Sequence, residues 1–152
     1  MLIPRELIRS APFAQALRFD LSPIQLGLGA SPWHVAVASV MLCRVKRNVS
    51  VVASVFRRWQ TPTLLAESDD ALADALRPLG FQRQRARQLQ TLSRKWDTDT
   101  WELLTDLPGV GQYVNDAVGL FCFGCTDLES SDGVLQAYAA HLREEERQRS
   151  AV

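Results

Sequence analysis

The sequence has few cysteines and no apolar run that is long enough to cross a membrane. The apolar stretch at residues 33–43 is interrupted by His34 and Ser39, and it is far shorter than the roughly 18 residues of a membrane span. Three cysteines are an odd number, which fits a reducing compartment better than a disulfide framework. The N-terminus includes Glu6 and does not resemble a signal peptide. We therefore expect an intracellular protein, in the cytoplasm or nucleoid, or in the nucleus if the source is eukaryotic.

Strand-type alternation of polar and apolar residues is also scarce, and internal repeats, low-complexity tracts and Gly/Ser linkers are absent. The 152 residues are 47% hydrophobic and 22% charged, which is typical of a globular chain and excludes a disordered tail or a collagen-like fibre. The sequence predicts an all-α fold, a compact bundle of about seven or eight short helices. We expect a single domain over residues 1–152.

Helix start signals divide the chain. Ser31 as N-cap and Pro32 at the first helical position precede an almost entirely apolar segment, which predicts a buried central helix at residues 33–43. Ser68, followed by two aspartates, predicts another start. The helix after it should end at Pro78 and Gly80. Further helical patterns cover residues 49–59, 83–96, 100–104, 113–123 and 134–142.

The net charge of zero hides an asymmetry along the chain. Residues 44–95 carry 11 Lys or Arg and 4 Asp or Glu, whereas residues 96–152 carry 3 and 11. A basic middle segment of this kind could bind a polyanion such as nucleic acid. The alternative is that these cations lie on ordinary solvated helix faces.

The sharpest local motif is the run Leu107, Pro108, Gly109, Val110, Gly111, Gln112 and Tyr113. Two glycines around a small apolar residue allow a tight turn, which leaves backbone N–H groups and a helix N-terminus facing outward, where they could bind a phosphate. The motif therefore predicts a clamp on the DNA backbone. The alternative is a plain turn between helices, in which the glycines only relieve steric strain.

Taken with other segments, this motif resembles the helix-hairpin-helix (HhH-GPD) DNA glycosylase superfamily. The resemblance is closest to the catalytic domain of the methyl-CpG-binding-type thymine DNA glycosylases, and it extends from about residue 25 to about residue 142. Its strongest block is LPGVGQYVNDAVGLFC at residues 107–122, supported by matches at residues 32–33, 42–44, 77–81 and 85–86. The resemblance implies a hairpin motif at about residues 101–123 and a catalytic loop at about 125–133. The implied contacts to the DNA backbone come from Leu107, Gly109, Val110, Gly111 and Gln112.

The resemblance implies that Asp132 is the catalytic carboxylate. A carboxylate near C1′ can stabilise the oxocarbenium character that develops as the glycosidic bond breaks, and it can orient or deprotonate the attacking water. The alternative for Asp132 is an ordinary N-cap of the helix that follows. Asp127 or Glu129 would be the carboxylate if the loop were aligned differently.

Tyr113 occupies the position where bifunctional relatives carry a lysine that attacks C1′ and forms a Schiff base. A tyrosine cannot form one, so the resemblance implies a monofunctional glycosylase that leaves an abasic site, with Tyr113 lining the base pocket. The alternative is that Tyr113 is a half-buried core aromatic residue.

Four further residues have implied substrate-binding roles. Gln25 matches the glutamine that reads the pyrimidine edge, and its amide can donate and accept at once. Arg44 matches the side chain that fills the space left by the flipped nucleotide, although a simple phosphate contact is an alternative. Leu79 and Phe81 fall in the family's second wedge loop.

The sequence departs from its relatives in three places. The four-cysteine iron–sulfur pattern of the endonuclease III branch and a methyl-CpG-binding domain are both absent, and Gly133-Val134-Leu135 replaces more polar residues after the catalytic position. Cys122 and Cys125 have metal-like spacing, but the other soft ligands are scattered, so we expect core residues rather than a zinc site.

Together these features predict a monomeric enzyme of base excision repair that acts on double-stranded DNA without a metal or cofactor. It would flip thymine or uracil out of a mismatched duplex and hydrolyse the glycosidic bond. One alternative is an enzyme for modified pyrimidines, such as 5-hydroxymethyluracil or the hypermodified thymines of phage DNA. Another is a helix-hairpin-helix DNA-binding module that has lost catalysis.

Overall fold

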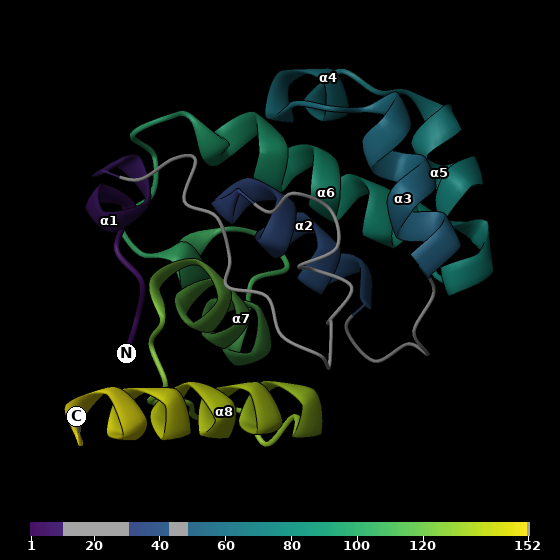
Figure 1. The fold of residues 1–152 in the computed structure, drawn as a ribbon. Coiled ribbons are helices and arrows are strands. Elements are labelled where there is room, and N and C mark those ends of the chain that lie inside the picture. Colours follow the sequence, from purple (N-terminus) through teal and green to yellow (C-terminus); the bar gives the residue numbers. More distant parts are fainter. Residues whose placement is uncertain (11–30, 43–48, 152) are drawn as a thin grey trace.

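The computed structural model describes residues 1–10, 31–42 and 49–151, and the predicted all-α fold is confirmed in these ranges (Figure 1). The one β-type pairing within them is an isolated antiparallel bridge between Pro4 and Leu103. The α-helices are α1 (Arg5–Ser10), α2 (Pro32–Leu42), α3 (Val49–Arg58), α4 (Pro62–Ala66), α5 (Asp70–Leu76), α6 (Gln82–Trp96), α7 (Gln112–Phe123) and α8 (Gly133–Ser150). Two short 3₁₀ helices, η2 (Arg77–Leu79) and η3 (Leu104–Asp106), complete the order.

Helix α2 is the centre of the core, as its apolar sequence predicts. Almost all its side chains are buried, and it packs against α7 on one side and α6 on the other (Figure 1). The hydroxyl of Ser31 accepts a hydrogen bond from the backbone N–H of His34 at 3.3 Å, so it acts as the predicted cap. Inside the core, the indole N–H of Trp33 donates to Ser93 of α6 at 3.1 Å. The one polar edge of that tryptophan is thereby satisfied.

The helix start at residue 68 was misplaced by one residue. Asp69, not Ser68, is the N-cap of α5, because its side chain accepts from the backbone N–H of Ala71 at 2.9 Å. Ser68 instead donates its hydroxyl to the carbonyl of Leu65, and it accepts from the side chain of Gln90. It therefore lies just beyond the C-cap of α4, Glu67, and links that end of α4 to α6.

The predicted helix at residues 100–104 is wrong. Residues 100–103 form no helix, and the 3₁₀ helix η3 begins only at Leu104, because the backbone here bonds to the N-terminal segment. The N–H of Leu104 donates to the carbonyl of Ile3 and the N–H of Arg5 donates to the carbonyl of Glu102, both at 2.8 Å. Beyond this segment, the Asp106 carboxylate accepts from the N–H groups of Leu103 at 2.9 Å and Glu102 at 3.1 Å. These two bonds, Leu103 first, lower the pKa of the Asp106 carboxyl.

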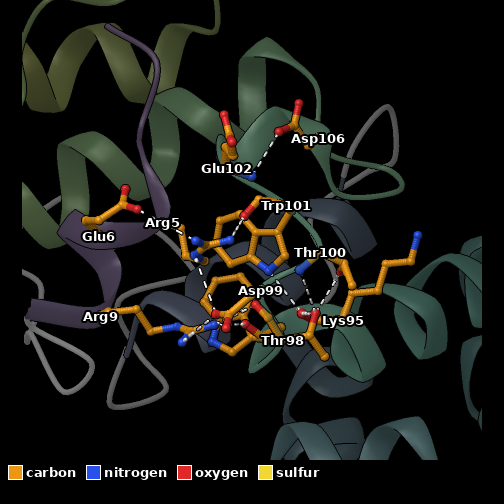
Figure 2. Close-up of polar contacts among 11 residues, drawn as sticks. Arg5, Glu6, Arg9, Lys95, Thr98, Asp99, Thr100, Trp101, Glu102 and Asp106 are labelled. Atoms are coloured by element: carbon orange, nitrogen blue, oxygen red, sulfur yellow. Dashed lines mark hydrogen bonds and ion pairs between the residues drawn. The ribbon is translucent and has the colours of Figure 1, made fainter.

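Two arginines of the N-terminal segment reinforce this pairing (Figure 2). Arg5 donates to the carbonyl of Trp101, and Arg9 donates to the carbonyls of Trp96 and Thr98.

The N-terminal segment is also bound by α7. The buried side-chain amide of Asn115 accepts from the N–H of Ile3 at 3.0 Å and donates to the carbonyl of Met1 at 2.8 Å. The first ten residues thus join the segment before the hairpin to the helix after it.

Replacing Asn115 with alanine should lower the free energy of unfolding by about 2 kcal/mol, because it leaves the buried N–H of Ile3 without a partner. Urea denaturation of Asn115→Ala beside the exposed amide variant Gln60→Ala measures this difference. Equal stability of the two variants would contradict the anchoring role of Asn115.

Candidate active site

The hairpin motif forms a tight turn between η3 and α7. Leu107 and Val110 are buried, and the N–H of Val110 donates to the carbonyl of Leu107 at 3.2 Å. Gly109 and Gly111, which alternate with these residues, are exposed. The apolar members therefore fix the turn to the core, while the glycines present bare backbone to solvent.

Gly109 and Gly111 differ in backbone conformation and in the space around them. Gly109 has a φ of +77°, and a Cβ there would meet Val40 of α2 at 3.4 Å and Gln88 of α6 at 3.6 Å. Gly111 has an ordinary φ of −104°, and nothing lies within 4 Å of an added Cβ. It serves as the N-cap of α7 without a side-chain cap. Because the first N–H groups of a helix have no intrahelical acceptor, this N-terminus can bind an anion.

Asp132 is the N-cap of α8, the position that the alternative interpretation gave it. One carboxylate oxygen, Oδ2, accepts from the backbone N–H of Leu135 at 3.0 Å. The other oxygen, Oδ1, accepts no hydrogen bond from the described residues, and the residue is only half-buried. The cap therefore fixes the orientation of the carboxylate and leaves one oxygen able to contact a ligand.

A second carboxylate, Asp116 of α7, holds the loop that leads to Asp132. It is 3% exposed, and its Oδ2 accepts from the backbone N–H groups of Glu129 at 3.0 Å and Ser130 at 2.7 Å. Its Oδ1 accepts from the side chain of Gln112 at 2.9 Å. In the sequence, Asp116 is only one member of the block at residues 107–122 that carries the resemblance, and its structural role was not predicted. An aspartate within an apolar helix was the available signal, because a buried carboxylate requires partners.

The alternative carboxylates have no comparable setting. Asp127 and Glu129 are both exposed, and the contact of Glu129 with Asp116 is made by its backbone N–H. Tyr113 is half-buried in the first turn of α7 and packs against the core. This position is compatible with both interpretations of Tyr113.

The two predicted wedge residues have opposite environments. Leu79 is buried with 8% exposure, whereas Phe81 is 77% exposed. Gly80 and Phe81 both have positive φ, +77° and +48°, and Phe81 is the one described residue other than glycine with this conformation. A left-handed backbone at a bulky residue costs free energy, so the loop presents the phenyl ring to solvent at the expense of stability.

Arg85 joins this loop to the end of the central helix. Its Nε donates to the carbonyl of Gly80 at 2.9 Å, and its Nη1 reaches the carbonyl of Met41 at 3.5 Å. Since a Cβ at Gly109 would lie within 3.6 Å of Val40 and Gln88, the hairpin passes close to α2 and α6, the two helices to which Arg85 joins the Phe81 loop. Gln25 and Arg44 fall outside the described residues, so their predicted roles stay predictions.

Cys122 and Cys125, the two cysteines that the structure describes, are free thiols. Burial raises the pKa of Cys122 to about 12 and also raises that of Cys125, so both thiols are protonated at neutral pH. Within the described ranges, no three His, Cys, Asp or Glu side chains are grouped as a metal site would require. None of the helices in these ranges has the length and apolar character needed to cross a bilayer.

Sequence comparisons identify relatives that include a thymine-DNA glycosylase. No protein-family model matches the chain. A methyl-CpG-binding domain protein 4-like protein of Arabidopsis thaliana is 29% identical over 116 residues, which are 74% of this chain and 26% of the relative. A thymine-DNA glycosylase of Aeropyrum pernix is 32% identical over 105 residues, which are 62% of this chain and 47% of the relative. The chain thus spans less than half of either relative.

Solved structures confirm the resemblance in fold. A thermostable thymine-DNA glycosylase matches with a TM-score of 0.60 at 23% identity, covering 80% of this chain and 60% of that one. Endonuclease III, trapped as a covalent intermediate with DNA, matches with a TM-score of 0.52 at 22% identity over 78% of this chain and 56% of that one. Its non-covalent DNA complex gives 0.53 at 20% identity over 91% and 72%.

The two hairpin glycines should respond differently to alanine. Gly109→Ala should lower the free energy of unfolding by about 1 kcal/mol or more, because an L-residue is strained at positive φ. Gly111→Ala should change it by less than about 0.5 kcal/mol, since its φ is ordinary and the space is open. Urea denaturation of both variants measures this, and equal losses would contradict the geometry of the turn.

Proposed function

Because this chain has the fold of the helix-hairpin-helix DNA glycosylases, we propose that it is a monofunctional DNA glycosylase acting on thymine or uracil in mismatched duplex DNA. The observation that carries the proposal is the setting of Asp132. Its carboxylate is fixed by the start of α8, has one oxygen without a hydrogen bond to the described residues, and is joined through Asp116 to the exposed hairpin turn. A fixed carboxylate beside an anion-binding turn suits an enzyme that must act on a nucleotide.

The hairpin supports the backbone contact. A DNA phosphate approaching the start of α7 would meet N–H groups and the positive end of the helix dipole, with no side chain at Gly109 or Gly111 to block it. Such contacts hold the duplex in one register without reading its sequence. Proposed base recognition by Gln25 and gap filling by Arg44 rest on the sequence resemblance alone.

The chemistry we propose is hydrolysis of the C1′–N bond of the flipped nucleotide. As the bond lengthens, the sugar gains positive charge, which the ionised Asp132 carboxylate stabilises. The same carboxylate accepts a proton from the attacking water, and the oxygen of that water forms the new bond to C1′. The base leaves with the bonding electron pair and is protonated. Tyr113 offers no amine for a Schiff base, so an abasic site in an intact strand is the product.

Phe81 is the proposed wedge. An exposed aromatic ring on a strained loop can enter the base stack, and the strain is tolerated because the loop is fixed by Arg85. Mismatched pairs cost less to unstack than Watson–Crick pairs, so wedging contributes to the proposed preference for mismatches.

Asp132→Asn should lose base excision by a factor of about 10² to 10⁴ while it binds DNA as the wild type does. The assay is alkali-dependent scission of duplexes with one G·T, G·U or G·5-hydroxymethyluracil pair, with binding measured by fluorescence anisotropy. Asp127→Asn, from the same loop, is the matched control and should keep full activity. An Asp132→Asn protein that cuts like the wild type would refute the assignment. If the wild type binds DNA and cuts none of these duplexes, the modified-base or binding-module alternatives gain support.

Phe81→Gly should stabilise the fold and weaken catalysis on duplex DNA. The substitution relieves the positive φ, so the free energy of unfolding should rise by about 0.5 kcal/mol. Excision from a G·U duplex should fall more than excision of a uracil that already lies in an unpaired loop. Leu64→Ala, at another exposed apolar residue, is the control for lost apolar surface. Equal effects on both substrates would contradict the wedge.

A further inference from the structure

We infer that Asp116 is a positioning residue that sets the place of the Asp132 carboxylate relative to the hairpin turn; the inference rests on the proposed function. Asp116 touches neither the proposed reacting atoms nor solvent, since it is 3% exposed on α7. It contacts the first residue of α7 on one side and the loop before α8 on the other. It therefore joins the two parts of the candidate site.

The loop before α8 depends on this carboxylate for its shape. Residues 124–132 contain no helix or strand, so no regular backbone ladder fixes where the loop ends. Asp116 accepts two consecutive backbone N–H groups, those of Glu129 and Ser130, through a single oxygen. These part-buried bonds satisfy both donors and hold the loop against α7 only two residues before Asp132.

Ser130 passes this constraint on to Asp132. Its N–H is bound by Asp116, its hydroxyl accepts from the N–H of Asp132 at 3.2 Å, and its carbonyl accepts from the side chain of Gln136 at 2.7 Å. Three groups of one residue are thus fixed by α7, by Asp132 and by the first turn of α8. A change at Asp116 displaces Ser130 and, with it, the start of α8.

The other oxygen of Asp116 connects the site to the hairpin. Oδ1 accepts from the side chain of Gln112, whose backbone begins α7 at the proposed phosphate-binding turn. Gln112 and Asp132 are 20 positions apart in the sequence, yet a chain of hydrogen bonds joins them. It runs from the Gln112 side chain through the Asp116 carboxylate and Ser130 to the backbone N–H of Asp132. Asp116 thereby fixes the position of the Asp132 carboxylate relative to a phosphate bound at the turn. Attack on a nucleotide requires the reacting groups to be held in a fixed relative position.

This arrangement predicts a loss in the chemical step rather than in binding. Displacing a reacting group by about 1 Å can cost up to about 10²-fold in rate, so Asp116→Ala should slow single-turnover excision from a G·U duplex by about 10- to 100-fold. The DNA dissociation constant should change by less than about twofold, because the backbone of the hairpin is intact. Asp116→Asn should keep the rate within about threefold: its amide oxygen can accept both loop N–H groups, and Gln112 can turn its own amide to accept from the new NH₂.

The experiment measures single-turnover rates with protein in excess over the dissociation constant, well below each melting temperature. Asn115→Ala is the matched control, since it removes the neighbouring buried polar side chain and destabilises the fold without touching the loop. A rate loss in Asp116→Ala beyond that of Asn115→Ala, with rescue by Asp116→Asn, is the expected result. Wild-type rates in Asp116→Ala would overturn the inference and leave the proposed function standing. Absence of wild-type cleavage would overturn the proposed function and the inference with it.

If Asp116→Ala does not fold, Gln136→Ala decides the question. The Gln136 side chain is exposed and holds the carbonyl of Ser130, so its loss leaves the core intact. We expect excision to slow by about threefold or more at an unchanged dissociation constant. An unchanged rate would overturn the inference.

Discussion

Two buried polar side chains next to each other on α7 organise the candidate site. Asn115 binds the first residues of the chain, and Asp116 binds the loop before α8. Asn115 satisfies the buried N–H of Ile3, and the buried Asp116 carboxylate is itself satisfied by the N–H groups that it binds in the loop. Because α7 also begins at the hairpin turn and packs on the central helix α2, the position of this one helix fixes the turn, the loop and the N-terminal segment together.

The hairpin turn and the loop before α6 each combine buried and exposed residues. The residues that fix the hairpin to the core, Leu107 and Val110, are buried, whereas Gly109 and Gly111, on either side of Val110, are exposed. The loop before α6 combines a buried Leu79 with an exposed Phe81 in a strained conformation. In both places one apolar side chain anchors the backbone, and its neighbour is presented to solvent. Backbone strain such as that at Phe81 clusters at active sites and ligand clamps, where the surrounding structure enforces it.

Local signals predicted most of the helices, because caps and apolar periodicity act within a few residues. Ser31 caps α2 as its sequence indicates, and the helix at residues 113–123 begins within one residue of its predicted start. Residues 100–104 were predicted as helix, but residues 100–103 form none and the 3₁₀ helix η3 begins only at Leu104. Trp101 and Leu104 are spaced as on a helix face, but the backbone bonds of this segment go to Ile3 and Arg5, about 100 positions away. A sequence pattern contains no record of such distant pairing.

The candidate site, too, could be predicted from the sequence only in part. The N-cap position of Asp132 and the hairpin turn could be predicted, because an aspartate before a helix and a Gly-x-Gly turn are local patterns. The catalytic role of Asp132 rests on the sequence resemblance and stays a prediction. The role of Asp116 could not be predicted, since its partners in the loop lie 13 and 14 positions further along the chain. The opposite environments of Leu79 and Phe81 were also hidden, because they depend on the two positive φ angles at residues 80 and 81.

Release of a free base from an otherwise intact strand is the central claim, and mass spectrometry of a G·U duplex incubated with the wild-type protein tests it most directly. The account predicts free uracil together with an unbroken strand whose mass is lower by that of free uracil and higher by that of one water molecule. An unaltered strand, or a strand cleaved without alkali, would contradict a hydrolytic, monofunctional glycosylase.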